Sequence, residues 1–403
     1  MTNIKNDVLY LKEVFLSGYK SINNVNIEFQ KGLNIIIGKN AAGKTNFLKF
    51  LSKCLMLDYD ELNNFSANLI FENGREISLK ASRNIKIEDF LKQTDFSNKI
   101  ETVLTISGKI IKDNKKEWTS ISNKLTENNI IFDTTFLSHG LPNEYYIVDT
   151  SFSFKIQKRY VSSDILQILN DTKTPFFVRC LAIDLVSEIF NIETLNNTEI
   201  KKLLTSFFKI INPLNEILKK YTPIEEFRFN ENYNIFIDED KESFTLNNLF
   251  LEFKIDGNWL PYSNLSDGTK RLFYIISEVF EINEAENKRP SSSRRHFVGY
   301  EEISRIILIE EPELGIHPHQ FQKLMEFLKI ESEKKQIIIT THAPQALDAI
   351  HPDELNRIII AYLANAHEGT KLRHLNESEL IKAKEYVKED YLSDYWLYSD
   401  LEK

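Results

Sequence analysis

Cysteine is scarce in this sequence, because the 403-residue chain contains only Cys54 and Cys180. Two cysteines so far apart do not form the framework of a disulfide-stapled domain. Runs of about 18 apolar residues, which a membrane-spanning helix needs, are absent as well, and the N-terminal segment MTNIKNDVLYLKEV lacks the apolar core of a secretory signal. These absences predict a cytoplasmic protein with reduced thiols and without a membrane partner.

An excess of basic residues is also missing. Lys and Arg total 50 against 59 Asp and Glu, which gives a formal net charge of −9. Proteins that coat DNA by neutralising its phosphates usually carry a clear basic excess, so the composition does not indicate nucleic acid as a partner. Hydrophobic residues make up 42% of the chain and Phe occurs 28 times, which is ample material for a large core divided over two or three lobes.

The apolar pattern changes character several times along the chain. Alternation and hairpin signals indicate strands, helical periodicity indicates helices, and a continuous apolar run indicates a buried strand. The segments expected are strands at 8–17, 22–29 and 33–37, a helix at 43–57, antiparallel strands within 63–158, helices within 163–221, strands within 227–261, and a helix-and-strand core that resumes at Ser266.

This order predicts an α/β fold in which a mixed sheet is accompanied by an antiparallel β lobe and an inserted helical region. The core is expected to be split by the insertion. The boundaries expected are 1–62 for the first half of the core, 63–250 for the insertion, 251–363 for the second half, and 364–403 for a C-terminal helix and aromatic tail.

The segment GKNAAGKT fits the phosphate-binding pattern G-x-x-x-x-G-K-[ST]. The glycines let backbone N–H groups wrap around phosphates, Lys44 places a cation on them, and the Thr45 hydroxyl is a ligand for Mg²⁺. A chance glycine turn with a surface lysine is the alternative, but the apolar strand before it and the amphipathic helix after it favour the P-loop. The nucleotide-contacting residues expected are Gly38, Lys39, Asn40, Ala41, Ala42, Gly43, Lys44, Thr45 and Asn46.

The segment RIILIEEPE is an apolar strand that ends in two carboxylates. A Walker B strand needs one acid on the metal side and a second acid that polarises the attacking water. Glu310 is expected in the first role and Glu311 in the second, as general base. A buried strand that runs into a solvated acidic turn is the alternative, and the P-loop in the same chain weighs against it.

Two further segments follow the same logic. NLSDGTKRL places Ser266 and Gly268 at the start of a helix, where N–H groups and a hydroxyl form an anion site. Taken alone, this segment could be only an N-capped helix.

The segment QIIITTHAPQAL is an apolar strand ending in Thr-Thr-His, and a residue at the carboxyl end of such a strand meets the ligand crevice. His342 is therefore expected to sense the γ-phosphate, although a lone His is usually structural.

The four motifs in this order resemble the ATP-binding-cassette superfamily, and most of all its RecF, structural-maintenance-of-chromosomes (SMC) and overcoming-lysogenization-defect branch. FLSGYKSINNVNIEF resembles the N-terminal strand pair of that branch, and LSDGTKRL its signature, with Asp267 in place of the first Gly of LSGG. IEEPELGIHP and ITTHAPQAL are similar to its Walker B and switch segments. The resemblance covers about residues 8–57 and 251–363.

The resemblance implies an ABC-type head that binds ATP and Mg²⁺, with Thr45 and Glu310 on the metal side. It implies that Ser266 and Gly268 contact ATP held by an opposite subunit, so that two copies dimerise on ATP. Lys20 matches a basic residue that can reach the nucleotide. Glu310 stands where Asp is more frequent, and no Q-loop glutamine can be assigned, since the candidates Gln93, Gln157 and Gln167 all lie in the unmatched insertion.

The sequence also lacks features of some relatives. Only about 40 residues follow the last expected core strand, too few for the Toprim nuclease domain of overcoming-lysogenization-defect nucleases, and long heptad arms are absent. The expected function is therefore that of an ATPase that pairs with a separately encoded nuclease or toxin, as in bacterial anti-phage defence. A RecF-like DNA-repair ATPase is the alternative, and a transporter subunit is a third, weaker one.

Two segments are candidates for the partner surface. The C-terminal YLSDYWLYSDLEK interleaves aromatic and acidic residues, and aromatic side chains with polar ends favour interfaces. The alternative is that these aromatics pack on the chain's own helix at 377–388. The second candidate is the basic loop Lys288–Arg295, for which a solvated linker is the alternative.

Overall fold

The computed structural model describes most of the chain, and it divides into two compact units. The first contains residues 1–139, 302–312 and 328–403, and the second contains residues 140–301 and 313–327. The described residues are 10–56, 62, 64–72, 74, 76–84, 103–112, 115–119, 132–139, 152–157, 189, 192, 195–208, 211–239, 242–280, 304–365, 367–388 and 390–399.

A mixed six-stranded sheet forms the centre of the first unit, with the strand order β18-β17-β3-β16-β15-β8. All of these strands are parallel to their neighbours except β18, which is antiparallel to β17. Every residue of β3 and β16 is buried, as expected for strands covered on both faces. The strands are β3 (Leu33–Ile37), β8 (Phe132–Leu137), β15 (Ser304–Glu310), β16 (Gln336–Thr341), β17 (Ile358–Leu363) and β18 (Thr370–His374).

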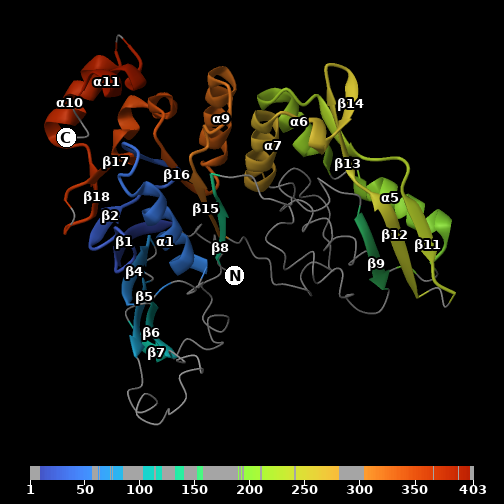
Figure 1. Cartoon of the computed structure of the whole chain (residues 1–403), viewed down its shortest axis with the longest axis horizontal. Coiled ribbons are helices and arrows are strands. Elements are labelled where there is room, and N and C mark those ends of the chain that lie inside the picture. Colours follow the sequence, from blue (N-terminus) through green and yellow to red (C-terminus); the bar gives the residue numbers. More distant parts are fainter. Residues whose placement is uncertain are drawn as a thin grey trace, which may run out of the picture. The chain divides into compact units, whose positions relative to one another are not determined.

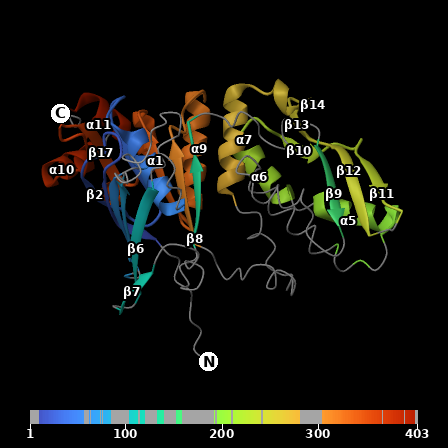
Figure 2. The same ribbon diagram turned by 60° about the horizontal axis from the view of Figure 1, so that its bottom comes forward.

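A second six-stranded sheet in this unit is antiparallel, with the order β2-β1-β4-β5-β6-β7. In β4 the residues alternate between buried and half-buried, so one face of the strand packs inward. Figure 1 draws this sheet in blue to teal, with β4 to β7 extending downward from β1, and β6 and β7 are seen again in Figure 2. Its strands are β1 (Leu11–Ser17), β2 (Val25–Glu28), β4 (Phe65–Phe71), β5 (Glu76–Asn84), β6 (Val103–Lys112) and β7 (Lys115–Thr119).

Helix α1 (Lys44–Met56) joins the two sheets into one hydrophobic core. Its apolar residues are buried nearly all round the helix, from Phe47 to Leu55, which is typical of a helix enclosed in a core. The cluster contains side chains of α1, of the antiparallel strands β1 and β4, and of the mixed strands β15 and β16. Burial also raises the pKa of the Cys54 thiol on this helix, so it stays protonated and unreactive.

One buried side-chain amide, that of Gln336, connects the mixed sheet to the antiparallel sheet. The Gln336 side chain, fully buried at the start of β16, accepts a hydrogen bond from the Leu11 N–H (2.9 Å). It donates to the carbonyl oxygens of Leu11 (2.8 Å) and Gln30 (3.1 Å). The side chain thus supplies the hydrogen bonds that a neighbouring strand would supply, and it satisfies backbone groups that would otherwise be costly to bury.

The position of strand β8 differs from the expected domain organisation. It lies within residues 63–250, which were expected to form the insertion, yet it pairs in parallel with β15 along the whole mixed sheet edge. The Arg305 guanidinium of β15 donates to the Thr135 hydroxyl of β8 at 2.9 Å. The insertion is therefore interrupted by a strand of the core. Of the other described strands within 63–158, β4 to β7 belong to the antiparallel sheet of the first unit, whereas β9 (Phe152–Gln157) belongs to a sheet of the second unit.

The second unit contains two three-stranded antiparallel sheets, β10-β13-β14 and β11-β12-β9. An aromatic cluster of Phe227, Phe253 and Phe273 fixes helix α7 to the first of these sheets. The elements are β9 (Phe152–Gln157), α5 (Asn197–Phe208), α6 (Asn212–Tyr221), β10 (Glu226–Phe229), β11 (Asn234–Ile237), β12 (Ser243–Leu249), β13 (Leu251–Ile255), β14 (Asn258–Pro261), η3 (Tyr262–Asn264), α7 (Asp267–Val279) and α9 (Pro318–Glu331).

The C-terminal part of the first unit is helical. It contains η5 (Pro344–Ala349), η6 (Pro352–Arg357), α10 (Glu377–Tyr386) and α11 (Leu392–Tyr398). Asn376 caps α10 through a reciprocal pair of hydrogen bonds with Glu379. Across the described part of the chain, none of the helices combines the length and apolar character needed to cross a bilayer.

Candidate functional site

The P-loop connects β3 to α1 and is shaped by its glycines. Gly43 has φ +89°, and a Cβ there would lie 1.8 Å from Thr370 Oγ1. A Cβ at Gly38 would lie 2.1 Å from the Ala361 carbonyl oxygen of β17. The loop thus passes so close to β17 and β18 that side chains at these two positions would collide with them.

Lys44, the first residue of α1, keeps its side chain over the loop. Its ammonium donates to the carbonyl oxygens of Gly38 (2.6 Å) and Lys39 (2.9 Å), and the residue is only 5% exposed. These bonds hold the charge beside the N-terminus of α1, where the helix dipole and free N–H groups also favour an anion.

Three polar side chains from separate segments meet behind the P-loop. The Asn46 amide donates to Ser21 Oγ at 2.9 Å, and Ser21 Oγ shares a hydrogen bond with Thr370 Oγ1 at 2.8 Å. The Thr370 N–H also donates to the Ser21 carbonyl oxygen at 2.8 Å. This network ties the β1–β2 turn, α1 and β18 together at Gly43.

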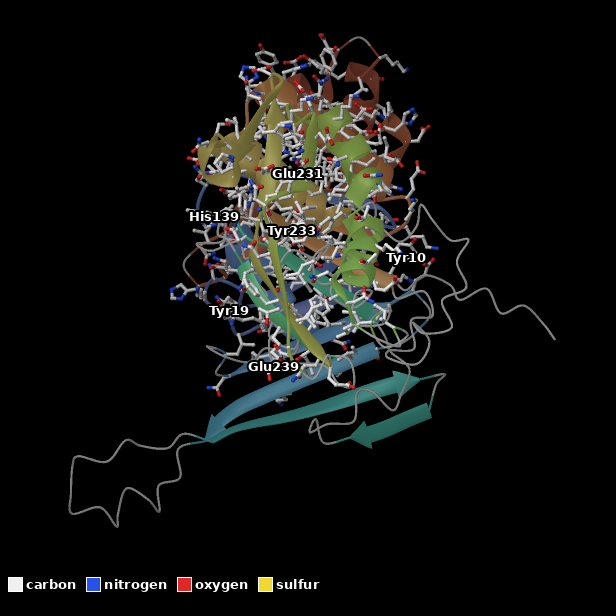
Figure 3. The ribbon with its side chains drawn as sticks, turned by 90° about the vertical axis from the view of Figure 1, so that its right-hand side faces the viewer. Tyr10, Tyr19, His139, Glu231, Tyr233 and Glu239 are labelled. Carbon is white, nitrogen blue, oxygen red and sulfur yellow. The ribbon has the colours of Figure 1, made fainter. Side chains whose placement is uncertain are left out.

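Lys20 lies in that same β1–β2 turn. Its backbone is in the left-handed region with φ +50°, which is uncommon for a residue other than glycine. Its ammonium lies 5.0 Å from the centroid of the Tyr19 ring, within cation–π range. Figure 3 labels Tyr19 in this turn and His139 in the loop after β8.

Glu310, the last residue of β15, is fully buried and surrounded by donors. The His139 backbone N–H (3.3 Å) and imidazole Nδ1 (3.0 Å) both reach its Oε2 atom, and Lys49 Nζ lies 4.0 Å from it. Burial alone would raise the pKa of this carboxyl. The hydrogen bonds from Thr45 and His139 and the charge of Lys49 outweigh burial and hold the pKa below its ordinary value.

Glu311 follows immediately and has an unusual backbone. Its φ is +44°, in the left-handed region, and its N–H donates to the Thr340 carbonyl oxygen of β16 at 2.8 Å. Strain of this kind costs about 1–3 kcal/mol and is retained where a side chain must be aimed. Glu311 Oε1 lies 3.8 Å from Nδ1 of His342, the residue after β16. The structure therefore brings the expected base and the expected sensor together.

The donors at this edge fit a magnesium–nucleotide complex. The Thr45 hydroxyl is hydrogen-bonded to the Glu310 carboxylate, which joins two oxygen donors of the kind that Mg²⁺ prefers. The glycine-lined loop and the buried ammonium of Lys44 stand beside them. Because β3, β15 and β16 are neighbouring parallel strands, all of these groups lie at the carboxyl edge of one sheet.

The signature segment lies in the second unit and is built locally. Ser266 is the N-cap of α7: its hydroxyl accepts from the Thr269 N–H at 3.2 Å and shares a hydrogen bond with the Thr269 hydroxyl at 2.9 Å. A Cβ at Gly268 would lie 2.5 Å from the Gly315 carbonyl oxygen, so glycine lets the loop after the acidic strand pass close to the helix. The capped helix is present, and its role toward ATP stays a prediction.

Sequence reasoning missed His139. It was placed in an antiparallel lobe, whereas it follows a core strand and contacts Glu310. A signal was available, because TTFLSH ends a strand with His in the same way as ITTH ends the strand before His342.

The two candidate partner surfaces had different outcomes. The basic loop Lys288–Arg295 lies outside the described residues. In the C-terminal segment Trp396 is buried and Tyr395 packs on Tyr386 of α10, with ring centroids 5.6 Å apart. Tyr391 and Tyr398 are 65% and 83% exposed. Part of the segment thus packs on the chain's own helices, as the alternative predicted, and part stays accessible.

Comparisons with known proteins agree with this geometry. Residues 188–348 match the family described as "AAA domain, putative AbiEii toxin, Type IV TA system". The chain is 24% identical to Septu protein PtuA of Bacillus thuringiensis, over 86% of this chain and 75% of that protein. It is 23% identical to the Retron Vc95 probable ATPase of Vibrio cholerae, over 88% and 74%. It is 25% identical to the DNA double-strand break repair Rad50 ATPase of Methanococcus maripaludis, over 68% of this chain and 26% of that protein.

Proposed function

We propose that this chain, an ATP-binding-cassette-type ATPase of the RecF and SMC branch, hydrolyses Mg-ATP as a head-to-head dimer and controls a separately encoded nuclease or toxin in anti-phage defence. One observation carries the catalytic part of the proposal. The P-loop lysine, the Thr45–Glu310 pair and the Glu311–His342 pair all lie at the carboxyl edge of one parallel set of strands.

The P-loop binds the phosphates. The N–H groups of residues 38–46 line the loop, and Lys44 supplies a buried positive charge that is already oriented by two carbonyl oxygens. Preorganised donors of this kind act without the cost of reorientation during the reaction. Lys20 precedes Ser21, whose side chain contacts Asn46, and we propose that the Lys20 ammonium reaches the nucleotide from the β1–β2 turn.

Thr45 and Glu310 would hold Mg²⁺. The cation, when bound, neutralises charge on the transferred phosphate. The chain's contribution is to keep Glu310 ionised within a fully buried position, which the hydrogen bonds from Thr45 and His139 achieve by lowering the pKa of its carboxyl. Glu in place of Asp adds one methylene between this carboxylate and β15.

Glu311 and His342 act on the attacking water and the terminal phosphate. Glu311 accepts the proton of the water, and its carboxylate is held beside His342 on a residue with a left-handed backbone. His342 lies at 3.8 Å from that carboxylate, so a change in the position of either side chain is felt by the other. This makes His342 suited to sense the γ-phosphate.

The signature segment completes a site in another copy of the chain. Ser266 and Gly268 stand at the N-terminus of α7, where N–H groups and the helix dipole favour a phosphate. We propose that they contact ATP bound at the P-loop of the opposite subunit, so that ATP joins two copies and hydrolysis separates them.

The defence role is supported by the relatives that cover most of the chain. A Septu protein and a retron ATPase align over 86% and 88% of it. An effector encoded separately is proposed by analogy with the ATPase halves of such systems. Phage infection of cells that carry this gene, with and without its neighbouring genes, tests the role. Equal plaque counts with and without the complete set would contradict it.

Glu311→Gln and Lys44→Ala test the catalytic part. Glu311→Gln should lower steady-state hydrolysis about 100-fold or more while keeping ATP binding, because an amide cannot accept the proton of water. It should also accumulate the ATP-bound dimer in size-exclusion chromatography. Lys44→Ala should instead weaken binding of a fluorescent ATP analogue. Hydrolysis by Glu311→Gln within threefold of wild type would remove Glu311 from its role.

A RecF-like repair ATPase is the second candidate, favoured by the likeness to Rad50 over 68% of this chain. The net charge of −9 weighs against a DNA-coating surface. The two functions differ in one measurement. A repair ATPase should hydrolyse ATP faster when double-stranded DNA is added, by an amount that falls as salt rises, whereas the defence ATPase should respond to its protein partner.

A further inference from the structure

Two nitrogen atoms of His139 lie within hydrogen-bonding distance of the same oxygen of Glu310. Its backbone N–H lies 3.3 Å and its Nδ1 3.0 Å from the same Oε2 atom. The carboxylate is fully buried, whereas the imidazole is about half exposed. The two residues are brought together by the parallel pairing of β8 with β15, although they are 171 positions apart in the chain.

The chemistry of a carboxylate determines which atom is the donor in the hydrogen bond between the His139 imidazole and Glu310. An ionised carboxylate only accepts hydrogen bonds, and Oε2 of Glu310 already accepts one from the His139 backbone N–H. Nδ1 of His139 therefore carries the hydrogen, and in the neutral imidazole Nε2 is left as an acceptor. Both donors of His139 are aimed at Oε2, so the carboxylate cannot rotate without breaking both bonds.

We propose that His139 is a positioning residue that sets the rotation of the Glu310 carboxylate, and through it the affinity of the site for the divalent cation of Mg-ATP. This inference rests on the function proposed above, because it needs Glu310 to face the cation. His139 acts through Glu310 and does not itself bind the metal.

Geometry favours this role over direct ligation. Nδ1 is already occupied by the carboxylate, and Mg²⁺ takes oxygen donors, of which Thr45 and Glu310 are two. Partners that orient a ligating group in this way typically change metal affinity or activity about 10–100-fold when removed. Lys49 stands 4.0 Å from the same oxygen and can offset part of the charge, but it makes no hydrogen bond at that distance.

Three substitutions separate the possible roles of the imidazole. His139→Ala removes the side-chain donor. His139→Asn places an amide N–H near the position of Nδ1 and has nothing at Nε2, whereas His139→Gln places its amide near Nε2 and loses the donor to Glu310. His351→Asn is a matched control, because His351 is exposed and caps η6, where Asn caps equally well.

The measurement is the affinity for Mn²⁺, used as a paramagnetic probe for Mg²⁺, in the presence of ADP and read by electron paramagnetic resonance. We expect His139→Ala to weaken Mn²⁺ binding about tenfold or more, and His139→Asn to recover most of that loss while His139→Gln does not. In a Glu310→Gln background, His139→Ala should change the affinity less than twofold, because the two residues act through one contact.

Two outcomes overturn the proposal while leaving the proposed function in place. One is Mn²⁺ binding by His139→Ala equal to wild type, when Glu310→Gln weakens it. The other is recovery by Gln and not Asn, with a directly coordinated nitrogen in the echo modulation of wild type that His139→Ala abolishes, since His139 would then be a ligand. If neither Glu310→Gln nor Lys44→Ala affects binding of Mn²⁺ and nucleotide, the proposed function fails and this inference fails with it.

Discussion

The phosphate-binding edge of the first unit and the signature helix of the second are held in different ways. At the first, contacts join segments that are far apart in sequence, such as Ser21 with Thr370 and His139 with Glu310. At the second, the contacts of Ser266 stay within one turn of α7.

This difference teaches what each region can do by itself. The first region brings the Lys44 ammonium, the Thr45 hydroxyl and the carboxylates of Glu310 and Glu311 to one edge, and it is the region in which we propose that the reaction takes place. The second offers only the donors of a helix start, which bind an anion weakly without further groups. This difference is what the proposed head-to-head dimer requires, in which the signature helix of each copy completes the site of the other.

The largest expected effect comes from mixing two inactive variants, which tests whether the sites are shared between copies. Ser266→Arg should abolish hydrolysis and keep ATP binding, because its bulk and charge would occupy the place of the opposite copy's ATP. Mixed with Lys44→Ala, it should recover partial hydrolysis, since one mixed site then has an intact P-loop and an intact signature. The readout is phosphate release from the mixture compared with each variant alone.

Ser266→Ala is the control for this experiment. It removes the cap of α7, at a cost of about 1 kcal/mol, without adding bulk. If the mixture stays inactive although both variants are folded and associate in analytical ultracentrifugation, the sites are not shared between copies. The interpretation that the signature helix of one copy completes the phosphate-binding edge of the other would then be wrong.

The next largest effect concerns the stability of the first region. Gln336→Leu should lower the free energy of unfolding by about 2–4 kcal/mol, because the N–H and carbonyl of Leu11 and the carbonyl of Gln30 lose their buried partner. Urea denaturation followed by circular dichroism measures it. Gln345→Leu, at an exposed position of η5, is the matched control. A loss no larger than in the control would show that the two sheets do not need this amide.

The smallest effect concerns the helix nearest the C-terminus. The Ser393 N–H and hydroxyl both donate to Asp348 of η5, each at 2.9 Å. Ser393→Ala removes only the second bond, so it should cost about 1 kcal/mol and speed hydrogen exchange of the α11 amides. Ser378→Ala, on the exposed start of α10, should cost a few tenths. Equal exchange rates in the two variants would contradict an anchoring role for Ser393.

The sequence predicted the parts of the site that are continuous in the chain. Strand β3 ends where the apolar run ends, and the P-loop and α1 follow within a residue of the expected positions. Glu311 and His342 each follow an apolar strand, so their arrival at one edge followed from parallel pairing. Local pattern and motif spacing are enough for such features, because each is encoded within about ten residues.

Other features of the same site depend on contacts between distant segments. Strand β8 reads FDTTFL, a short mixed polar and apolar segment that suits an antiparallel strand equally well, so its parallel pairing with β15 was not visible from the sequence. The Ser21–Thr370 contact joins a turn to a strand 349 positions later. The left-handed backbone of Glu311 is imposed by its surroundings and not by its own preference, since Glu rarely adopts it.

The position of Gln336 has a mechanical consequence. This residue begins β16, and His342 follows the other end of the same strand, about 20 Å away at the rise of a β-strand. Its side chain is bonded to Leu11, which begins β1 of the antiparallel sheet. Strand β16 therefore joins the first residue of β1 to His342, the residue that we propose as the γ-phosphate sensor. A displacement of β1 would be transmitted along β16 to His342 without any contact with the nucleotide.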